Sequence, residues 1–353
     1  MDEHRPKNVV ERVESHIKPA TYSRAGVDIR KENLVIKNIV AWANKTFKFR
    51  EGKIGAALGN IGTFANMVDL GDNRALVICS DGVGSKVLVA QELQKYDTVG
   101  IDVVAMNVND AICVGAEPII MVDYLAMEGQ DHEIAAEIAR GMYEGASQAG
   151  IAIVGGETAT LPDMIKGVQN RGFDLAAAVV GIVDKDKIIT GENIQPGDKV
   201  VGFESNGIHS NGLTLARKVL PVSMWPNLLE PTRIYVKEVL TLLKEYEIKG
   251  LANITGTGML NLLRITKYGF QLDNMHEPQL IFKKIQELGK VSDEEMYRTF
   301  NMGMGFCLIA SEQDAAAIKK KYGREYRLDI VGTVIERHLV KIVKGDKTIL
   351  IEE

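Results

Sequence analysis

The sequence of 353 residues contains only 3 cysteines and 9 prolines, and these shortages exclude several classes of protein. The cysteines Cys79, Cys113 and Cys307 each lie inside an apolar run, without the CxxC or Cys/His spacing of a metal or redox site, so we expect structural thiols in a reducing cytoplasm. Because prolines are few, the 34 glycines do not indicate a linker or collagen. The composition predicts a globular protein.

Basic charge and long apolar runs are also missing. The formal net charge is -5, and we find no basic stripe, which argues against a nucleic-acid partner. The N-terminal segment is charged throughout and has no apolar core, so it is neither a signal peptide nor an anchor. No uncharged apolar stretch approaches the roughly 18 residues of a membrane span. We therefore expect a soluble, cytoplasmic protein without a membrane partner.

The length and the pattern of turns predict two domains. A chain of this length exceeds one ordinary domain of about 100 to 200 residues. The pattern becomes polar and turn-rich between Asp184 and Asp198, which is where we expect the domain boundary. We predict an N-terminal extension over residues 1–20, an ATP-binding α+β domain over 21–186 and an α/β domain over 187–353.

Helical and strand-like segments alternate in the first half of the chain. The final two predicted strands follow one another with only a loop between them, which favours an α+β fold with a mixed sheet over a doubly wound sheet. The predicted helices cover Val9–Ile17, Asn33–Thr46, Asp97–Val114 and His132–Ala149, and the strands cover Ala75–Ser80, Ile119–Ala126, Ile151–Val154 and Asp174–Val183. In the second half we predict helices over Gly212–Leu220, Thr232–Tyr246, Met259–Ile265, Pro278–Leu288 and Asp314–Tyr322, and strands over Lys199–Glu204, Gly305–Ser311 and Leu328–Glu336, before a final hairpin.

The glycine surplus gathers at predicted strand ends and helix starts, where free backbone N–H groups favour anions. Standard phosphate motifs do not fit: Ser85 precedes Lys86 where a Walker loop needs the reverse order, and Val87 occupies the place of a third Rossmann glycine. Any one cluster alone would more often be a simple turn. The clusters are Gly55–Gly62, Asp81–Lys86, Gly155–Thr158, Ser205–Gly212 and Thr255–Gly258.

Carboxylates accompany these clusters. Asp81 ends an apolar strand at a glycine turn, a costly place for a charge without a partner. Asp110 lies in an otherwise apolar helix, on which Asp102 and Asn109 share a direction and form a polar ridge beside it. Helix capping or satisfied buried hydrogen bonds would explain this pattern. The alternative is a set of oxygen ligands, with Glu157 as a third candidate, for Mg²⁺ bridging the phosphates of a nucleotide.

His209 is the only one of the 6 histidines inside a glycine cluster. A lone histidine is usually structural, but one near a predicted helix N-terminus could donate to an anion or act as a general acid or base. The neighbouring Ser210 and Asn211 offer side-chain donors suited to a substrate phosphate. The sequence leaves both roles of His209 open.

Seven motifs together resemble one family. They are YSRAGVDI (22–29), SDGVGSK (80–86), the long block over 96–126, VGGETATLPDM (154–164), SNGIHSNG (205–212), EPTRIYVKEVL (230–240) and EMYRTFNMGMGF (295–306). In this order and spacing they are similar to phosphoribosylformylglycinamidine cyclo-ligases, also called aminoimidazole ribonucleotide synthetases. The resemblance extends from about Tyr22 to near the end of the chain.

The resemblance implies a homodimer whose N-terminal domains share a β-barrel, and ATP- and Mg²⁺-dependent closure of the imidazole ring of formylglycinamidine ribonucleotide in purine biosynthesis. It implies catalytic roles for Asp81, Asp110 and His209, with Asp81 and Asp110 as the metal ligands. It assigns ATP or phosphate binding to Gly59, Gly62, Gly82, Gly84, Lys86, Asn109, Gly155, Gly156, Glu157 and Thr158, and substrate binding to Ser210, Asn211, Gly212, Thr255 and Gly256.

The sequence departs from the family pattern at Asn60 and Thr257, where further glycines are usual. The nearest alternative hypothesis is a thiamine monophosphate kinase-like phosphotransferase of the same superfamily. A non-catalytic nucleotide-binding regulator is a second alternative. A selenophosphate synthetase is excluded because no cysteine precedes Cys79.

Overall fold

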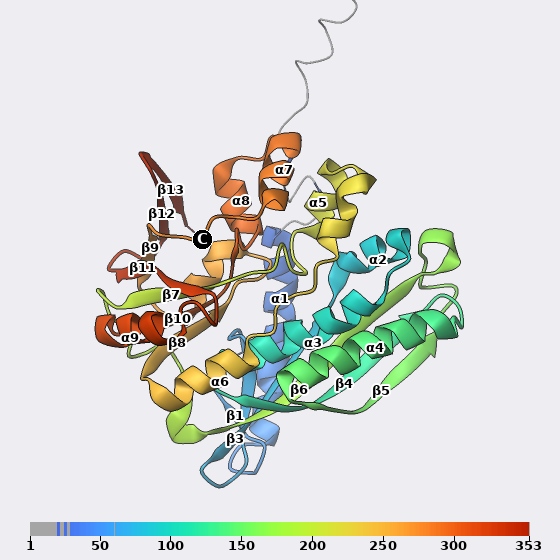
Figure 1. Cartoon of the computed structure of the whole chain (residues 1–353). Coiled ribbons are helices and arrows are strands. Elements are labelled where there is room, and N and C mark those ends of the chain that lie inside the picture. The colour runs from blue at the N-terminus through green and yellow to red at the C-terminus, as the bar shows by residue number, and fades with distance from the viewer. Residues whose placement is uncertain (1–19, 22–24, 27–28, 60, 353) are drawn as a thin grey trace, which may run out of the picture.

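The computed structural model describes residues 20–21, 25–26, 29–59 and 61–352. The predicted helix over Val9–Ile17 and the departure at Asn60 lie outside these ranges. Two layered units lie side by side, each built on one β-sheet with helices against it (Figure 1). No helix in the described part of the chain is long and apolar enough to span a membrane.

The first sheet has six strands in the order β1-β2-β3-β6-β4-β5. The strands are β1 (Ala57–Leu58), β2 (Asn66–Asp69), β3 (Arg74–Gly82), β4 (Glu117–Met127), β5 (Ala152–Thr160) and β6 (Phe173–Asp184). Only β4 and β5 pair in parallel, and the helix α4 (His132–Ala149) connects them, as expected for a parallel crossover. The mixed sheet predicted from the sequence is confirmed.

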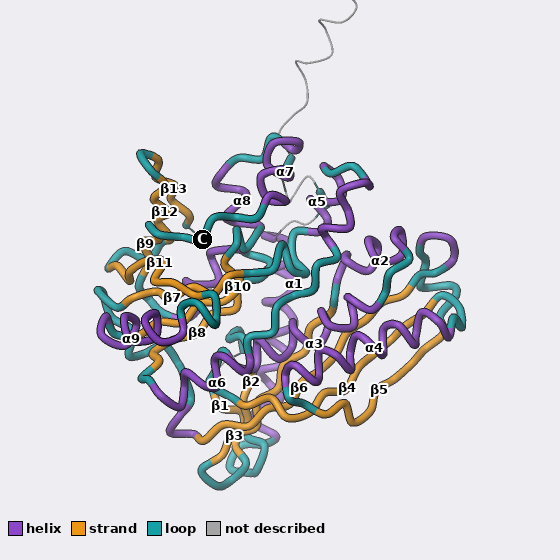
Figure 2. The backbone as a smooth tube through the Cα atoms, viewed as in Figure 1, coloured by secondary structure: helices purple, strands orange, loops and turns teal. Residues whose placement is uncertain are grey.

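Helices α3 (Asp97–Ile112) and α4 cover one face of this sheet (Figures 1 and 2). The two helices approach closely because glycines meet at their contact: a Cβ atom on Gly100 would overlap the carbonyl of Ile138, and one on Gly141 would overlap the carbonyl of Asp97. Nearly every residue of α3 is buried. The helix is therefore a rigid support for the polar side chains that it carries.

The opposite face of the sheet carries exposed apolar side chains. Ile78, Val122 and Tyr124 pair with Val180, Ala178 and Ala176 of β6, so all three point away from the helix-covered face. Their exposed fractions are 39%, 43% and 39%. Exposed apolar side chains gathered on one face of a sheet are typical of surfaces that contact a partner.

The second sheet has seven strands in the order β13-β12-β9-β11-β7-β10-β8, and only β9 and β12 pair in parallel. Its strands are β7 (Lys199–Glu204), β8 (Ile248–Asn253), β9 (Gly269–Leu272), β10 (Met304–Ala310), β11 (Leu328–Ile335), β12 (Val340–Lys344) and β13 (Lys347–Ile351). The α-helices of this unit are α5 (Leu213–Val219), α6 (Val236–Glu245), α7 (Leu280–Gly289), α8 (Asp293–Thr299) and α9 (Glu312–Tyr322). The remaining helices in the described residues are α1 (Ile29–Ala43), α2 (Val87–Leu93) and the 3₁₀ segments η2 (Asn44–Phe49), η3 (Gly84–Lys86), η4 (Val168–Asn170), η5 (Lys185–Lys187), η6 (Val222–Leu228) and η7 (Gly258–Ile265).

Three predicted elements differ from the structure. The helix expected from Thr232 begins only at Val236, because the preceding residues form hydrogen bonds to α3 instead. The α-helix expected over Met259–Ile265 is the 3₁₀ segment η7. The cluster Gly155–Thr158 is not a turn after a strand, since β5 continues through it to Thr160.

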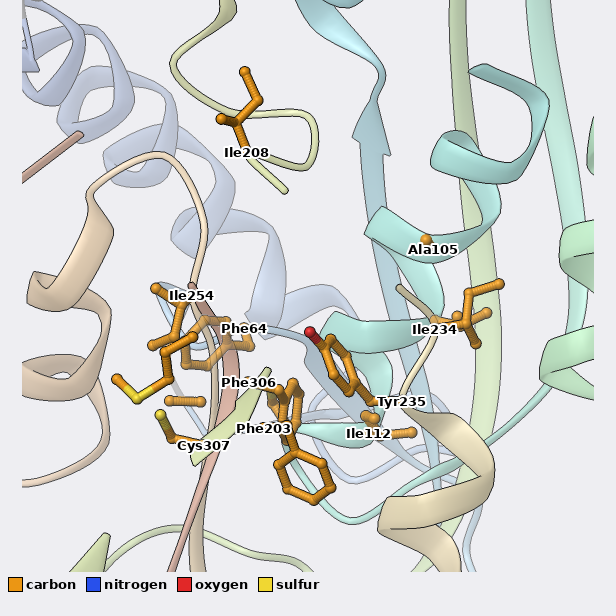
Figure 3. Packing of buried hydrophobic residues seen from close by; sticks show 14 of the residues in the cluster. Phe64, Ala105, Ile112, Phe203, Ile208, Ile234, Tyr235, Ile254, Phe306 and Cys307 are labelled. Atoms are coloured by element: carbon orange, nitrogen blue, oxygen red, sulfur yellow. The ribbon is translucent and has the colours of Figure 1, made fainter. Parts of the chain in front are cut away.

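The two sheets are joined between Asp184 and Lys199, and α6 of the second unit packs against α3 and α4 of the first. The boundary after residue 186 remains a prediction within this connection. Figure 3 shows an aromatic group in the core near this junction: the ring of Tyr235 lies beside Phe203 and Phe306, at centroid distances of 5.7 and 5.3 Å. All three cysteines are buried and free, as predicted.

Candidate active site

Asp81 and Asp110 lie close enough to influence each other's charge, at the end of β3 and near the end of α3. Asn107 joins the two elements. Its Oδ1 accepts a hydrogen bond from the backbone N–H of Asp81 at 2.9 Å, and its Nδ2 donates to the carbonyl of Asp81 at 3.1 Å. Asn107 therefore fixes the strand end that carries Asp81 against the helix that carries Asp110.

The pKa of Asp110 is raised to about 7, mainly by burial and also by the nearby charge of Asp81, while a hydrogen bond from Asn253 and the guanidinium of Arg264 oppose this shift. Asn253 Nδ2 donates to Asp110 Oδ1 at 2.8 Å. The pKa of Asp81 is also raised, because the surrounding chain removes water from its carboxylate. The carboxylates of Asp81 and Asp110 are thus partly removed from water, and Arg264 is the cation near Asp110. A hard divalent ion bound between the two carboxylates would stabilise their charged forms.

No third metal-ligating side chain in the described part of the chain lies beside Asp81 and Asp110. The described residues contain no group of three or more His, Cys, Asp or Glu side chains placed to share one ion. An ion held by Asp81 and Asp110 would therefore take its other ligands from water or from a bound phosphate, which is how Mg²⁺ is usually held in nucleotide sites. The residues present fit Mg²⁺ in that manner.

Arg264 connects the glycine cluster Gly55–Gly62 to this site, because its guanidinium lies near both Gly62 and Asp110. Arg264 Nη2 donates to the carbonyl of Gly62 at 3.3 Å, and its guanidinium lies 4.1 Å from the centre of the Phe64 ring. Gly59 and Gly62 have φ of 83° and 129°, so both need the freedom of glycine. The loop that carries them lies next to the residues around Asp110.

The cluster after β3 contains two residues expected to bind phosphate, Gly84 and Lys86, whose surroundings differ. Gly84, with φ of 64°, has open space where a Cβ would point, as a backbone that meets a ligand requires. Lys86 does not face that space. Its side chain is fully buried, and its Nζ lies 2.7 Å from Asp102 Oδ2 and donates to the carbonyl of Glu230 at 2.7 Å. In this structure Lys86 is thus a buried ion-pair partner of Asp102, and its assignment as a phosphate ligand stays a prediction.

Asn109 also contacts the second unit of the chain. Its Nδ2 donates to the carbonyl of Arg233 at 2.8 Å, and its Oδ1 accepts from the backbone N–H of Tyr235 at 3.0 Å. With both polar atoms of its side-chain amide engaged and the residue buried, Asn109 binds the second unit of the chain in this structure, and its assignment as a phosphate ligand stays a prediction. The polar ridge predicted on this helix exists, and Asp102 and Asn109 both face the segment over 230–235.

The residues Gly155 to Thr158 lie exposed on edge strand β5. Gly155 has open space beside it, whereas a Cβ on Gly156 would overlap the carboxylate of Asp123. Asp123 pairs with Ala177 of β6, which pairs on its other side with Asp81, so both aspartates point to the same face of the sheet. The sequence reasoning missed Asp123.

His209 lies inside the loop over 205–212, with φ of 59°. Its Nε2 accepts a hydrogen bond from the backbone N–H of Asn206 at 3.4 Å, and its side chain is buried. Burial, with smaller effects from Lys86 and Arg233, lowers the pKa of His209 to about 3. The imidazole is therefore neutral at pH 7 and shapes the loop, so this conformation offers no exposed ring for a general acid.

The substrate-binding candidates lie in two neighbouring loops. Ser210 Oγ lies 3.2 Å from Thr232 Oγ1, and a Cβ on Gly256 would lie 3.3 Å from Asn211 Oδ1. Gly212 has φ of 72° and would overlap the ring of Phe300 if it carried a side chain. Thr255 precedes Gly256 and is half-buried, which places all five predicted substrate residues in one region.

Four residues at or beside the site escaped the sequence reasoning: Asp123, Thr232, Asn253 and Arg264. Thr232 lies in the motif EPTRIYVKEVL, which marked its segment but not its contact with Asp102. Asn253 and Arg264 lack any local pattern, and Asn253 is 143 positions from its partner Asp110. Only the folded chain brings them together.

Solved structures share this two-unit fold at low sequence identity. The structure of a HypE–HypF complex matches with a TM-score of 0.61 at 19% identity, over 82% of this chain and 93% of that one. The structure of AaThiL complexed with AMPPCP and TMP also gives 0.61, at 14% identity, over 87% of this chain and 94% of that one. These likenesses define the fold.

Comparison with family models and with curated sequences identifies the family of this chain. Residues 62–183 match the N-terminal domain of AIR synthase related proteins, and residues 195–345 match the C-terminal domain. The phosphoribosylformylglycinamidine cyclo-ligase of Pyrococcus furiosus is 52% identical over 328 residues, which cover 90% of this chain and 96% of that relative. That of Methanocaldococcus jannaschii is 50% identical over 335 residues, 90% of this chain and 92% of the relative. The chain belongs to the phosphoribosylformylglycinamidine cyclo-ligase family.

Proposed function

We infer that this protein is a phosphoribosylformylglycinamidine cyclo-ligase of purine biosynthesis. The observation that carries this inference is its identity of 52% to such an enzyme across nearly its whole length. The arrangement of Asp81, Asp110, Asn107 and Asn253 at one place supports it, because this is a site suited to a metal-bound nucleotide.

The reaction transfers the γ-phosphoryl group of ATP to the amide oxygen of formylglycinamidine ribonucleotide. The nearby amidine nitrogen then forms the new C–N bond, the C–O bond breaks, and inorganic phosphate leaves with a proton released to solvent. An amide oxygen is a poor leaving group, whereas phosphate is a good one. The products are aminoimidazole ribonucleotide, ADP and phosphate.

Asp81 and Asp110 would hold Mg²⁺, which when bound offsets the charge of the ATP phosphates. Asn107 fixes the backbone of Asp81, and Asn253 orients the carboxylate of Asp110. The exposed backbone of the glycine clusters would approach the phosphates; the residues proposed for this are Gly59, Gly62, Gly82, Gly84, Gly155, Glu157 and Thr158. Gly156 contributes by leaving space for Asp123.

Ser210, Asn211, Gly212, Thr255 and Gly256 would bind the ribonucleotide. His209 supports this loop from within, since its ring accepts a hydrogen bond from Asn206 and packs near Tyr235 at a centroid distance of 6.4 Å. We propose this supporting role in place of direct acid–base catalysis. A neutral, buried imidazole fits it.

The protein acts as a homodimer in this proposal. The open face of the first sheet, with Ile78, Val122 and Tyr124 exposed, gives each chain an apolar surface that a second copy would cover. Burying such a face of two sheets against each other would complete a closed β-structure, in line with the barrel that the family resemblance implies.

The test is a substrate-dependent assay. The purified protein with ATP, Mg²⁺ and formylglycinamidine ribonucleotide should release ADP and form aminoimidazole ribonucleotide in equal amounts. A parallel reaction with thiamine monophosphate serves as the contrast. ADP release that depends on thiamine monophosphate and not on the ribonucleotide would refute the proposal, as would the absence of both.

A further inference from the structure

The segment Glu230–Tyr235 belongs to the second unit and lies along the polar ridge of α3 in the first unit. We call these residues the interdomain strap. Lys86 donates to the carbonyl of Glu230, and Asn109 binds the backbone of Arg233 and Tyr235. In the middle, the backbone N–H of Thr232 donates to Asp102 Oδ1 at 2.7 Å. The strap therefore has a fixed position relative to the helix that carries Asp110.

The carboxylate of Asp102 determines which hydroxyl is the donor in the hydrogen bonds of Thr232. It is fully buried and paired with the ammonium of Lys86, at 2.7 Å from Oδ2, so it acts as an acceptor. Thr232 Oγ1 lies 2.6 Å from Asp102 Oδ1, within the distance of a charge-assisted hydrogen bond. The single hydroxyl hydrogen of Thr232 is therefore committed to Asp102.

Ser210 must then act as the donor toward Thr232. The two hydroxyl oxygens lie 3.2 Å apart, and Thr232 has no second hydrogen to give. Once the hydrogen of Ser210 points at Thr232, only the lone pairs of Ser210 Oγ remain for another partner. The residue is half-buried, in the loop proposed to bind the ribonucleotide.

We propose that Thr232 is a positioning residue that fixes Ser210 as a hydrogen-bond acceptor, so that Ser210 receives a hydrogen bond from an O–H or N–H group of the ribonucleotide. A phosphate oxygen at neutral pH has no hydrogen to give, so the partner of Ser210 is on the sugar or on the open-chain or ring nitrogens. This reverses the role as a phosphate donor that the sequence suggested. The inference rests on the proposed cyclo-ligase function.

The first experiment compares three variants of the full-length enzyme by steady-state kinetics and thermal unfolding. Thr232→Val removes the hydroxyl at nearly constant shape, Thr232→Ser keeps it, and Ser210→Ala removes the acceptor. We expect Thr232→Val and Ser210→Ala each to raise KM for the ribonucleotide about tenfold, as the loss of one oriented hydrogen bond would. KM for ATP should stay within twofold for all three variants.

The matched variant Thr232→Ser should restore KM for the ribonucleotide to within about threefold of the wild type. The double variant Ser210→Ala/Thr232→Val should be no worse than Ser210→Ala alone, because both changes act on one hydrogen bond. Equal effects of Thr232→Val and Thr232→Ser would overturn the positioning role, as would additive effects in the double variant. A wild type that fails to form aminoimidazole ribonucleotide would instead refute the proposed function.

The second experiment identifies the group that Ser210 meets. The dissociation constants of aminoimidazole ribonucleotide and of its nucleoside, which lacks the phosphate, are measured by calorimetry or competition with the wild type and Ser210→Ala. If Ser210 accepts from the sugar or base, the substitution weakens both ligands by the same factor. A loss confined to the ribonucleotide would mean that Ser210 binds the phosphate, and the inference would be wrong.

Discussion

Asp81 and Asp110 show at the scale of single residues how neighbouring charges define a site. If they hold Mg²⁺, Asp81→Asn or Asp110→Asn should lower kcat by about 100-fold or more, since each removes a negative ligand from the ion. Asp186→Asn provides the control, because Asp186 is exposed in the connecting segment and bonds to Asn73. The measurement is the rate of ADP release by each variant over a range of Mg²⁺ concentrations. Full activity in either site variant would remove that residue from the metal site.

His209 should remain neutral throughout the physiological range. Its pKa of about 3 lies below the value of about 6.5 expected in the unfolded chain. Between these values the unfolded chain binds a proton that the folded protein refuses, so the free energy of unfolding falls as the pH drops below about 6.5. The imidazole signals of His209 in an NMR titration should not move between pH 8 and pH 5.

The lowered pKa of His209 should also make the free energy of unfolding depend on pH. Between pH 6.5 and 5, His209 should account for a loss of about 2 kcal/mol in the free energy of unfolding. His209→Asn is a suitable comparison because asparagine tolerates the positive φ of this position. Urea unfolding of the variant at pH 7.5 and 5 should show a smaller difference than in the wild type. An equal difference in both proteins would contradict the assigned burial effect.

Single residues were predictable from the sequence where a local pattern was anomalous. Asp110 was identified because a carboxylate interrupts an apolar helix, and Asp81 because it ends an apolar strand at glycines. The contacts of Lys86 could not be predicted, because nothing local reveals its ion pair with Asp102, 16 positions away, or its hydrogen bond to Glu230, 144 positions away. The sequence shows which polar groups would be buried, but not which partners satisfy them.

At the scale of secondary structure, β5 offers a matched pair of glycines. Gly156→Ala should lower the stability by about 1–3 kcal/mol and disturb Asp123, since the new Cβ would overlap its carboxylate. Gly155→Ala should change the stability by much less, because open space surrounds that position. Thermal unfolding and kcat of both variants test this difference. Equal losses would show that strand conformation and not the contact with Asp123 requires glycine here.

The elements themselves were predicted best where apolar runs end at clear stop signals. The helix predicted over His132–Ala149 is found with these bounds, with Asp131 accepting hydrogen bonds at its start and Gly150, at φ of 72°, ending it. The strand continues through Gly155 and Gly156 because pairing with β4 overrides the local preference for a turn. The start of α6 was misplaced for a similar reason, since the strap binds α3.

At the scale of the whole molecule, the open sheet face leads to a prediction about assembly. Tyr124→Glu places a charge on the sheet face proposed to form the dimer contact and should shift the protein to a monomer at micromolar concentration. Tyr143→Glu is the matched control, because Tyr143 is 72% exposed on the outer surface of α4. Light scattering coupled to size-exclusion chromatography distinguishes the two. A dimeric Tyr124→Glu variant would place the contact elsewhere.

The contacts of α3 with the interdomain strap also bear on the order in which the chain matures. Asp102 and Asn109 find their partners 130 and 126 positions further along. While the protein is being synthesised, the N-terminal unit leaves the ribosome before the strap exists, and these polar groups must stay hydrated or associate with something else. A fragment ending near residue 186 would lack the strap permanently: Asp102 would keep its ion pair with Lys86, but Asn109 would lose both of its partners. The two units are thus separate in sequence and in their sheets, yet the hydrogen bonds of α3 are complete only when the second unit has been made.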